Sequence, residues 1–354
     1  PKDNGKMRLL GIPTVVDRLV QQAINQVLTP IYENQFSKTS YGFRPRRGCH
    51  DALRGAQRII NEGYIYVVDL DLERFFDTVS HSKLIEILSR TIKDGRVVSL
   101  IHKYLRSGVM NKGLFEASEE GTPQGGPLSP LLSNIMLNEL DKELERRGLP
   151  FVRYADDSMI FCKSKRAAMR VKESITRFIE NTLYLKVNKE KTVVSYVRGV
   201  KYLGYSFYVM KGKCHLTVHS KSKAKMKSRL KELTSRSNGW GYAKRKQKLK
   251  EYIRGWVSYY HLANMKRLLL ETDEWLRRRI RMCIWKAWKK VKTKVANLIR
   301  CGINKYQAYE WGNTRKGYWR IADSPILKRA IDNNKLRSAG YATLMEAYLE
   351  WYPK

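Results

Sequence analysis

The chain has 354 residues, 43% of them apolar, which suffices for two or three folded domains and excludes a disordered tail. Lys and Arg number 69 against 33 Asp and Glu, and a net charge of +36 is usually balanced by a polyanion such as nucleic acid. No apolar run approaches the length of a membrane span, so we expect no membrane partner.

Helix and strand signals alternate through the first 210 residues. Helices are expected where apolar residues recur every three to four positions, and strands where short apolar runs lie between turn residues. The expected helices cover 17–31 (ending at Pro30), 80–90 (capped by Ser80), 130–147 and 167–181. The expected strands cover 64–72, 151–162 with a tight turn at its centre, and 193–209. This order predicts an α+β domain whose strands are mainly antiparallel.

After Ser220 the pattern is nearly all helical, with basic amphipathic stretches at 221–236, 244–262 and 265–290. Residues 211–300 hold 27 Lys and Arg against five Asp and Glu. We therefore divide the chain into a mixed domain at 1–210, a basic helical domain at 211–300 and an extension at 301–354. That extension is either a small DNA-contacting tail or a cap on the helical domain.

Two acidic clusters lie on predicted strands of this basic chain, Asp69-Leu70-Asp71 and Asp156-Asp157. Like charges placed together destabilise a fold unless something compensates them, and a magnesium ion is the usual compensator for oxygen ligands. Taken alone, however, an Asp-Asp pair at a turn is more often structural, because Asp accepts turn conformations. The ordered motifs around the clusters are what favour a metal site.

The five cysteines are odd in number and no pair has the spacing of a zinc site, which is typical of reduced thiols in a cytoplasmic protein. Cys214, His215 and His219 lie close in sequence. Nothing supplies a fourth ligand at a recognisable spacing, so we interpret them as part of a polar strand or turn.

A series of motifs resembles the bacterial group II intron-encoded reverse transcriptases and maturases, in order from residue 1 to about residue 300. Any single block is a weak signal, but eight in series are specific. The blocks are Pro1–Pro13, Ser40-Tyr41-Gly42-Phe43-Arg44-Pro45, Asp71–Asp77, Gly121–Pro130, Tyr154-Ala155-Asp156-Asp157, Asn188–Thr192, Tyr202-Leu203-Gly204-Tyr205 and Arg279–Lys289.

The resemblance implies a right-hand polymerase, with fingers and an antiparallel palm sheet packed on helices at 1–210, followed by an all-helical thumb (maturase) domain. It also implies two magnesium ions, for which manganese is expected to substitute. The family pattern assigns them to Asp71, Asp156 and the backbone carbonyl of Leu72, with Asp157 as support or ligand. Asp69 is the backup ligand, because it lies two residues from Asp71 on the same strand face.

The family pattern also implies which residues meet the substrates. Lys2, Arg8, Gln124, Gly125 and Lys191 are expected at the incoming nucleotide, Lys191 as proton donor to the leaving pyrophosphate. Phe76 is expected to exclude a 2′-hydroxyl, with plain core packing as the alternative. Tyr202, Leu203, Gly204 and Tyr205 are expected to position the primer end. The candidates for nucleic-acid binding are Arg44, Lys221, Lys223, Lys225, Arg277, Arg278, Arg281 and Lys286.

The expected function is primer extension on an RNA template with dNTPs, together with binding of group II intron RNA and target DNA, in the bacterial cytoplasm and at the nucleoid. The alternatives are a maturase without polymerase activity, a reverse transcriptase of the retron or diversity-generating type, and an RNA-templated RNA polymerase. The chain begins within the first motif and carries no terminal His/Cys cluster, so we expect a fragment of an endonuclease-lacking protein.

Overall fold

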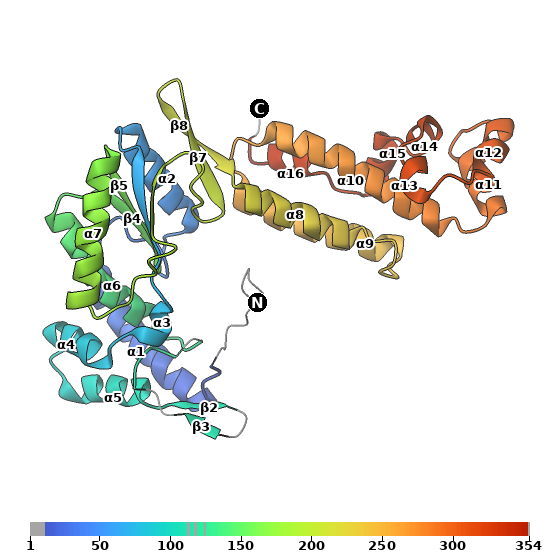
Figure 1. The fold of residues 1–354 in the computed structure, drawn as a ribbon. Coiled ribbons are helices and arrows are strands. Elements are labelled where there is room, and N and C mark those ends of the chain that lie inside the picture. Colours follow the sequence, from blue (N-terminus) through green and yellow to red (C-terminus); the bar gives the residue numbers. More distant parts are fainter. Residues whose placement is uncertain (1–10, 112–113, 117–118, 124, 353–354) are drawn as a thin grey trace. The chain divides into compact units, whose positions relative to one another are not determined.

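The computed structural model describes residues 11–111, 114–116, 119–123 and 125–352 (Figure 1). This part of the chain divides into two compact units. One holds the residues up to Leu203 together with Phe207–Cys214, and the other holds Gly204–Ser206 and the residues from His215 on. Within the described residues, no helix is both long enough and apolar enough to cross a membrane.

The first unit is built on a sheet whose described strands have the order β4-β5-β1-β6, with every neighbouring pair antiparallel. Successive side chains of a strand point to opposite faces. Val68 and Ile160 lie on one face and Val67 and Phe161 on the other, and all four are buried, so both faces are covered. The strands are β1 (Tyr66–Leu70), β4 (Phe151–Tyr154), β5 (Asp157–Cys162) and β6 (Val193–Tyr196).

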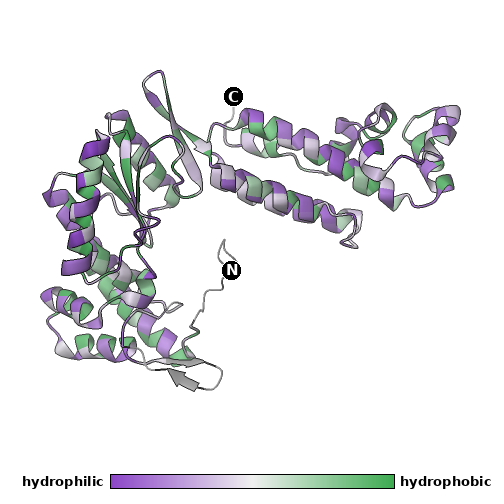
Figure 2. Cartoon of the chain, viewed as in Figure 1, coloured by the Kyte–Doolittle hydropathy of each residue, from purple (hydrophilic) through white to green (hydrophobic). Residues whose placement is uncertain are grey.

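Helices of the first unit cover this sheet. The helix α7 packs on β1, β5 and β6, while α2 packs on β4, and Figure 2 shows apolar residues concentrated in the strands between them. The expected α+β architecture with antiparallel strands is confirmed. The helices are α1 (Val15–Glu33), α2 (Cys49–Asn61), α3 (Phe75–Thr78), α4 (His81–Thr91), α5 (Gly95–Leu105), α6 (Ser129–Arg146) and α7 (Lys165–Thr182), and a small hairpin pairs β2 (Val109–Asn111) with β3 (Leu114–Glu116).

The predicted helix and strand positions in this unit are confirmed, with corrections at their ends and one break. The strand expected at 193–209 is divided into two, at 193–196 and from Tyr205 on, and the second part lies outside the four-stranded sheet. Ser80 accepts a hydrogen bond from the Lys83 amide and begins α4, as expected. The first helix does not stop at Pro30 but continues to Glu33. Leu28 and Tyr32 are buried on either side of this proline, so tertiary packing maintains the last turn against local propensity. Helices α2 and α5 were missed.

The second unit contains the three expected basic helices, α8 (Ser220–Leu233), α9 (Tyr242–Tyr260) and α10 (Lys266–Ala287). In the chain, a hairpin of β7 (Tyr205–Met210) and β8 (Lys213–Val218) precedes them, and its residues Phe207–Cys214 belong to the first unit. The polar strand expected around Cys214 and His215 is β8. The short helices that follow α10 are α11 (Val291–Arg300), α12 (Lys305–Gly312), α13 (Tyr318–Ile321), α14 (Pro325–Ala330), α15 (Asn333–Ser338) and α16 (Leu344–Leu349).

Residues 301–352 pack back on the basic helices. The helix α16 contacts α9 and α10, and the Asp273 carboxylate of α10 accepts hydrogen bonds from the amides of Leu344 (2.8 Å) and Met345 (2.9 Å). The Arg281 guanidinium donates to the Ile331 carbonyl at 2.7 Å. The described part of this segment is thus attached to α10 as a cap, and DNA contact by the segment stays a prediction.

Candidate active site

The turn between β4 and β5 carries the paired aspartates. Tyr154 and Asp157 face each other as the last pair of these strands, so Ala155 and Asp156 form the connection. Ala155 has a φ of 59°, a left-handed conformation that a non-glycine residue seldom adopts. Asp156 lies at the tip of this tight turn, and its side chain is exposed.

Strand register brings the other aspartates to this turn. Asp69 pairs with Met159 and Leu70 with Ser158, so continuing the ladder by one residue sets Asp71 opposite Asp157. Because residues that face each other across an antiparallel pair share a face, Asp69, Asp71 and Asp157 project to the same side of the sheet. Two acidic clusters that lie almost 90 residues apart in sequence therefore converge.

Crowding of these carboxylates changes their protonation. Burial, followed by repulsion from Asp69, Asp156 and Asp71, raises the pKa of Asp157 to about 7. Burial and the neighbouring Asp71 raise the pKa of Asp69 to about 6. Both shifts show that negative charge is costly here without a positive partner.

Lys191 supplies one such positive charge. Its Nζ lies 3.2 Å from Oδ2 of Asp71, close enough for an ion pair but without the geometry of a hydrogen bond. This Oδ2 is buried and, among the described residues, has no hydrogen-bond partner. The Lys191 side chain is 70% exposed, which leaves it free to move when another cation approaches.

Oxygen donors of this kind suit a hard divalent cation. In the described part of the chain, however, no three His, Cys, Asp or Glu side chains lie arranged around one point as a metal ion needs. The donors therefore fit magnesium chemically, and their side chains must reorient to bind it.

The segment that carries Lys191 is attached to the end of β1. The Asn188 amide donates to the Asp71 carbonyl at 2.9 Å, and the Glu73 amide donates to the Lys186 carbonyl at 2.8 Å. In such a ladder the carbonyl of the intervening residue, Leu72, points away from the partner strand. That orientation leaves the Leu72 carbonyl available as a ligand.

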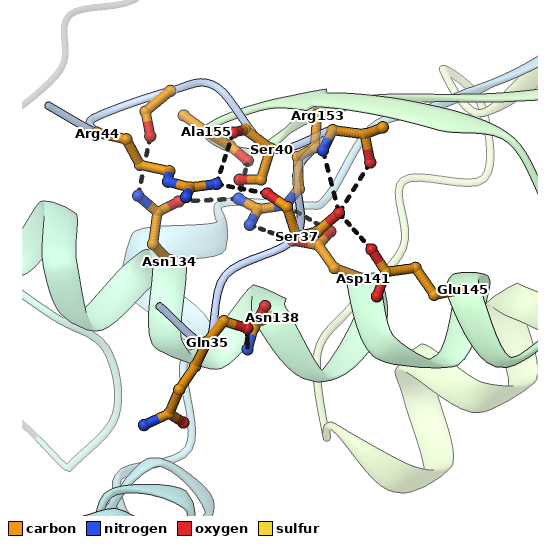
Figure 3. Close-up of polar contacts among 12 residues, drawn as sticks. Gln35, Ser37, Ser40, Arg44, Asn134, Asn138, Asp141, Glu145, Arg153 and Ala155 are labelled. Atoms are coloured by element: carbon orange, nitrogen blue, oxygen red, sulfur yellow. Dashed lines mark hydrogen bonds and ion pairs between the residues drawn. The ribbon is translucent and has the colours of Figure 1, made fainter. Parts of the chain in front are cut away.

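A buried polar network supports the turn from below (Figure 3). Arg153 of β4 and Asp141 of α6 form a bidentate ion pair at 2.8 and 2.5 Å, with both side chains fully buried. Arg153 also donates to the Ala155 carbonyl (3.0 Å) and to Oδ1 of Asn134 (2.9 Å). One guanidinium thus connects the turn backbone to α6.

The loop that contains Gly42 packs against the same turn. A Cβ on Gly42 would lie 2.2 Å from the Ala155 amide nitrogen and 2.8 Å from the Tyr154 carbonyl carbon, distances that no side chain tolerates. Asn134 donates to the Gly42 carbonyl at 2.9 Å. Only glycine allows this approach, so the loop and the turn form one rigid piece.

Sequence reasoning missed the residues on α6 that build this network. Asn134, Asn138, Asp141 and Glu145 recur at helical spacing on a helix that is otherwise largely apolar and buried. Figure 3 shows Asn134, Asp141 and Glu145 on the side of α6 toward the turn, whereas Asn138 lies apart from them and donates to the Gln35 carbonyl at 3.2 Å. A polar stripe at this spacing on an apolar helix was the available signal.

Phe76 lies just beyond Asp71 and is half-buried. Its ring meets that of Phe75 edge-on at 5.4 Å and packs against the core of the first unit. Its carbonyl accepts a hydrogen bond from the Thr122 amide at 2.6 Å, which joins it to the loop after Gly121. Phe76 therefore has both core contacts and an exposed part.

Of the other residues expected at the incoming nucleotide, the structure describes only some. Lys2, Arg8 and Gln124 lie outside the described residues. Gly125 is exposed, with a φ of 115° that favours glycine.

The expected primer-positioning segment is mostly core. Tyr202 is fully buried in the first unit, and burial and the nearby Asp157 raise the pKa of its hydroxyl well above its usual value. Tyr205 is buried in the second unit, where its hydroxyl bonds to the Tyr259 carbonyl. Leu203 and Gly204 are half-exposed and left-handed, so only these two can meet a primer directly.

Two candidate nucleic-acid residues turn out to be structural. Arg44 is buried and donates to the Glu33 carboxylate and to the carbonyls of Ser37 and Ser40, and Arg281 is buried against Ile331 and Asn333. Burial removes both guanidinium groups from any nucleic-acid surface, so we withdraw them from the interface.

The remaining candidates are accessible to different degrees. Lys221 and Lys225 are exposed, and Lys223 and Arg277 are half-exposed. Arg278 stacks on Trp319 at 3.9 Å and pairs with Asp323, and Lys286 donates to the Arg236 carbonyl at 2.9 Å.

Comparison with known proteins places these features in a family. Residues 1–207 match the family model for reverse transcriptase (RNA-dependent DNA polymerase), and residues 223–302 match the group II intron maturase-specific domain. The first match covers more than half of the chain.

Individual relatives agree with the family models. Protein YkfC of Escherichia coli is 36% identical, over 58% of this chain and 64% of that protein. The group II intron-encoded protein LtrA of Lactococcus lactis is 33% identical, over 59% of this chain and 45% of that protein. The chain thus spans about half to two-thirds of these relatives. Among solved structures, apo telomerase from Candida tropicalis matches 96% of this chain and 56% of its own, with 14% identity and a TM-score of 0.47.

Proposed function

The chain belongs to the reverse transcriptase family, and on that premise we propose that it extends a DNA primer on an RNA template by consuming dNTPs. The observation that carries the proposal is the convergence of Asp69, Asp71 and Asp157 on one face of β1 and β5, beside Asp156 at the tip of the turn.

We assign Asp71, Asp156 and the Leu72 carbonyl as holders of two magnesium ions, with Asp157 as support and Asp69 as backup. Bound there, two such ions would activate the primer 3′-hydroxyl and stabilise the leaving pyrophosphate. Arg153 and Gly42 fix the turn that carries Asp156, which keeps the donors in position. Lys191 starts beside Asp71 and would give its proton to the pyrophosphate.

Primer extension tests this function. On an RNA template with a DNA primer and dNTPs, the unaltered chain should extend the primer with magnesium and with manganese. Asp156→Asn and Asp71→Asn should each abolish extension while template–primer binding persists, because only the metal donors are lost. Glu62→Gln, which removes one exposed acid at the end of α2, is the matched control and should extend normally. Extension by either aspartate variant would refute the assignment.

A second role is favoured by the maturase-specific match and by the charge of the helices it covers. We propose that the second unit binds group II intron RNA, with target DNA as a further partner, and that the protein works in the bacterial cytoplasm and at the nucleoid. Lys221, Lys223, Lys225 and Arg277 are the proposed phosphate contacts.

RNA-binding measurements separate this role from polymerisation. Neutralising phosphates releases counterions, so the affinity for structured intron RNA should fall steeply with salt. Lys221→Gln/Lys225→Gln should lower the slope of log Kd against log salt by about 1.8, since each phosphate contact contributes about 0.9. Lys213→Gln/Lys211→Gln, in the β7–β8 hairpin, is the charge-matched control. An unchanged slope in the first variant would contradict the proposed contacts.

A further inference from the structure

Phe43 is an exposed aromatic residue immediately beside the aspartate turn. Its side chain is 54% exposed, and it follows Gly42, whose backbone lies against Ala155. Gly42 and Phe43 form the turn of their loop, and Phe43 has a φ of 57°. That left-handed position favours glycine or asparagine and disfavours a bulky ring.

The loop around Phe43 is fixed on both sides. The Tyr41 amide donates to the Arg153 carbonyl at 2.8 Å, and Asn134 holds the Gly42 carbonyl at 2.9 Å. On the other side, the buried Arg44 guanidinium donates to the carbonyls of Ser37 and Ser40 and to Glu33. The backbone of Phe43 is therefore held in an unfavourable conformation while its ring faces solvent.

Neither local structure nor core packing explains this placement. Tyr184 also has a left-handed φ, 55°, and a 61% exposed ring, but it lies just after the C-terminus of α7, where left-handed residues commonly end helices. Phe43 ends no helix and belongs to no buried cluster among the described residues. Strained residues of this kind concentrate at functional sites.

We propose that the ring of Phe43 is a stacking platform for a nucleobase of the bound template–primer, adjacent to the Asp156 turn. An aromatic face accepts any base, because stacking does not read hydrogen-bonding edges. The rigid contact between Gly42 and Ala155 sets the distance between this platform and Asp156, so a stacked base would be positioned relative to the reacting primer end. This inference rests on the proposed function, since it requires a template–primer at the site.

Equilibrium binding of an RNA template–DNA primer without dNTPs tests the platform on the full chain. Phe43→Asn should raise the Kd about tenfold, while Phe43→Trp should keep it, because only the first removes the ring. The Tm of Phe43→Asn should stay the same or rise, because asparagine tolerates the left-handed backbone. Tyr184→Asn, matched in backbone and exposure, should leave the Kd unchanged.

Abasic substitutions identify the stacked base. We would measure a series of template–primers, each lacking one base near the primer end. For one of them, loss of the base should raise the Kd of the unaltered chain about tenfold. For Phe43→Asn, the same abasic template–primer should bind as the intact one does, because the stacking contact is already lost. Four results would each overturn the platform. In the abasic series, the contradicting result is that the Kd increases of base removal and of Phe43→Asn add at every position. Among the variants, the contradicting results are an unchanged Kd or a lower Tm in Phe43→Asn, or an equal increase in Kd in Tyr184→Asn. Because no dNTP is present, a chain that shows the expected binding but never extends a primer would refute the proposed function and leave the platform standing.

Discussion

The guanidinium of Arg153 and the carboxylate of Asp141 form an ion pair from which solvent is fully excluded, directly beneath the aspartate turn. A third hydrogen bond of the same guanidinium holds the Ala155 carbonyl. The buried guanidinium of Arg153 therefore contributes both to the stability of the first unit and to the position of Asp156.

Breaking this pair from one side should be costly. Asp141→Leu leaves an uncompensated buried guanidinium and should lower the free energy of unfolding by about 3–5 kcal/mol, whereas Asp141→Leu/Arg153→Met should lose less than the sum of the two single changes. Urea denaturation measures both. Glu86→Gln, in the exposed pair with Arg90, is the control and should cost far less. Additive losses would contradict the coupling.

Gly42→Ala should disturb the active turn more than the fold. The added methyl group would meet the Ala155 amide at 2.2 Å, so the turn must shift, with about 1–3 kcal/mol of destabilisation. We expect kcat for primer extension to fall even at a temperature where the variant is fully folded, so unfolding does not explain the loss. Gly48→Ala, whose Cβ would meet nothing closer than 3.8 Å, should leave extension unchanged.

Phe76 should control the choice of sugar. Phe76→Ala removes the half-buried ring and should increase ribonucleotide use relative to deoxynucleotide by at least about tenfold, measured as the ratio of kcat/KM values. Phe76→Tyr keeps the ring and should keep the preference. If the preference survives in Phe76→Ala, the ring serves packing against Phe75 alone.

Lys191 should matter in the chemical step. Loss of a general acid lowers rates by about 10²-fold or more, so Lys191→Ala should lower the single-turnover rate constant of nucleotide addition. Lys189 is exposed two residues earlier, and Lys189→Ala should leave this rate constant unchanged. A loss that extra magnesium restores would show instead that the ammonium only compensates the Asp71 carboxylate, 3.2 Å away.

Asp273 should hold the C-terminal helices on α10. Asp273→Ala removes the acceptor for the Leu344 and Met345 amides and should cost about 1–2 kcal/mol, as loss of a helix cap does. Hydrogen exchange of residues 344–349 should speed up selectively. Asp332→Ala removes a comparable cap from α15 and is the control, since it should leave exchange in α16 unchanged.

The sequence alone predicted the α+β first unit, the three basic helices and the family, and all three are confirmed. These features are local: a strand alternates every second residue and a helix repeats every 3.6, so apolar patterns reveal them without tertiary knowledge. The motif residues Asp71, Asp156 and Asp157 also stand out locally, although their roles as metal ligands stay predictions.

Only the tertiary structure decided which charges are available and what holds the site. Arg44 and Arg281 look like any other basic residue in sequence, and burial against distant acceptors removes them from the interface. The pairing of Arg153 with Asp141, the approach of Gly42 to Ala155 and the contact of Lys191 with Asp71 join residues that lie 12, 113 and 120 positions apart. No local pattern encodes such contacts, because they form only when separate helices and strands pack together.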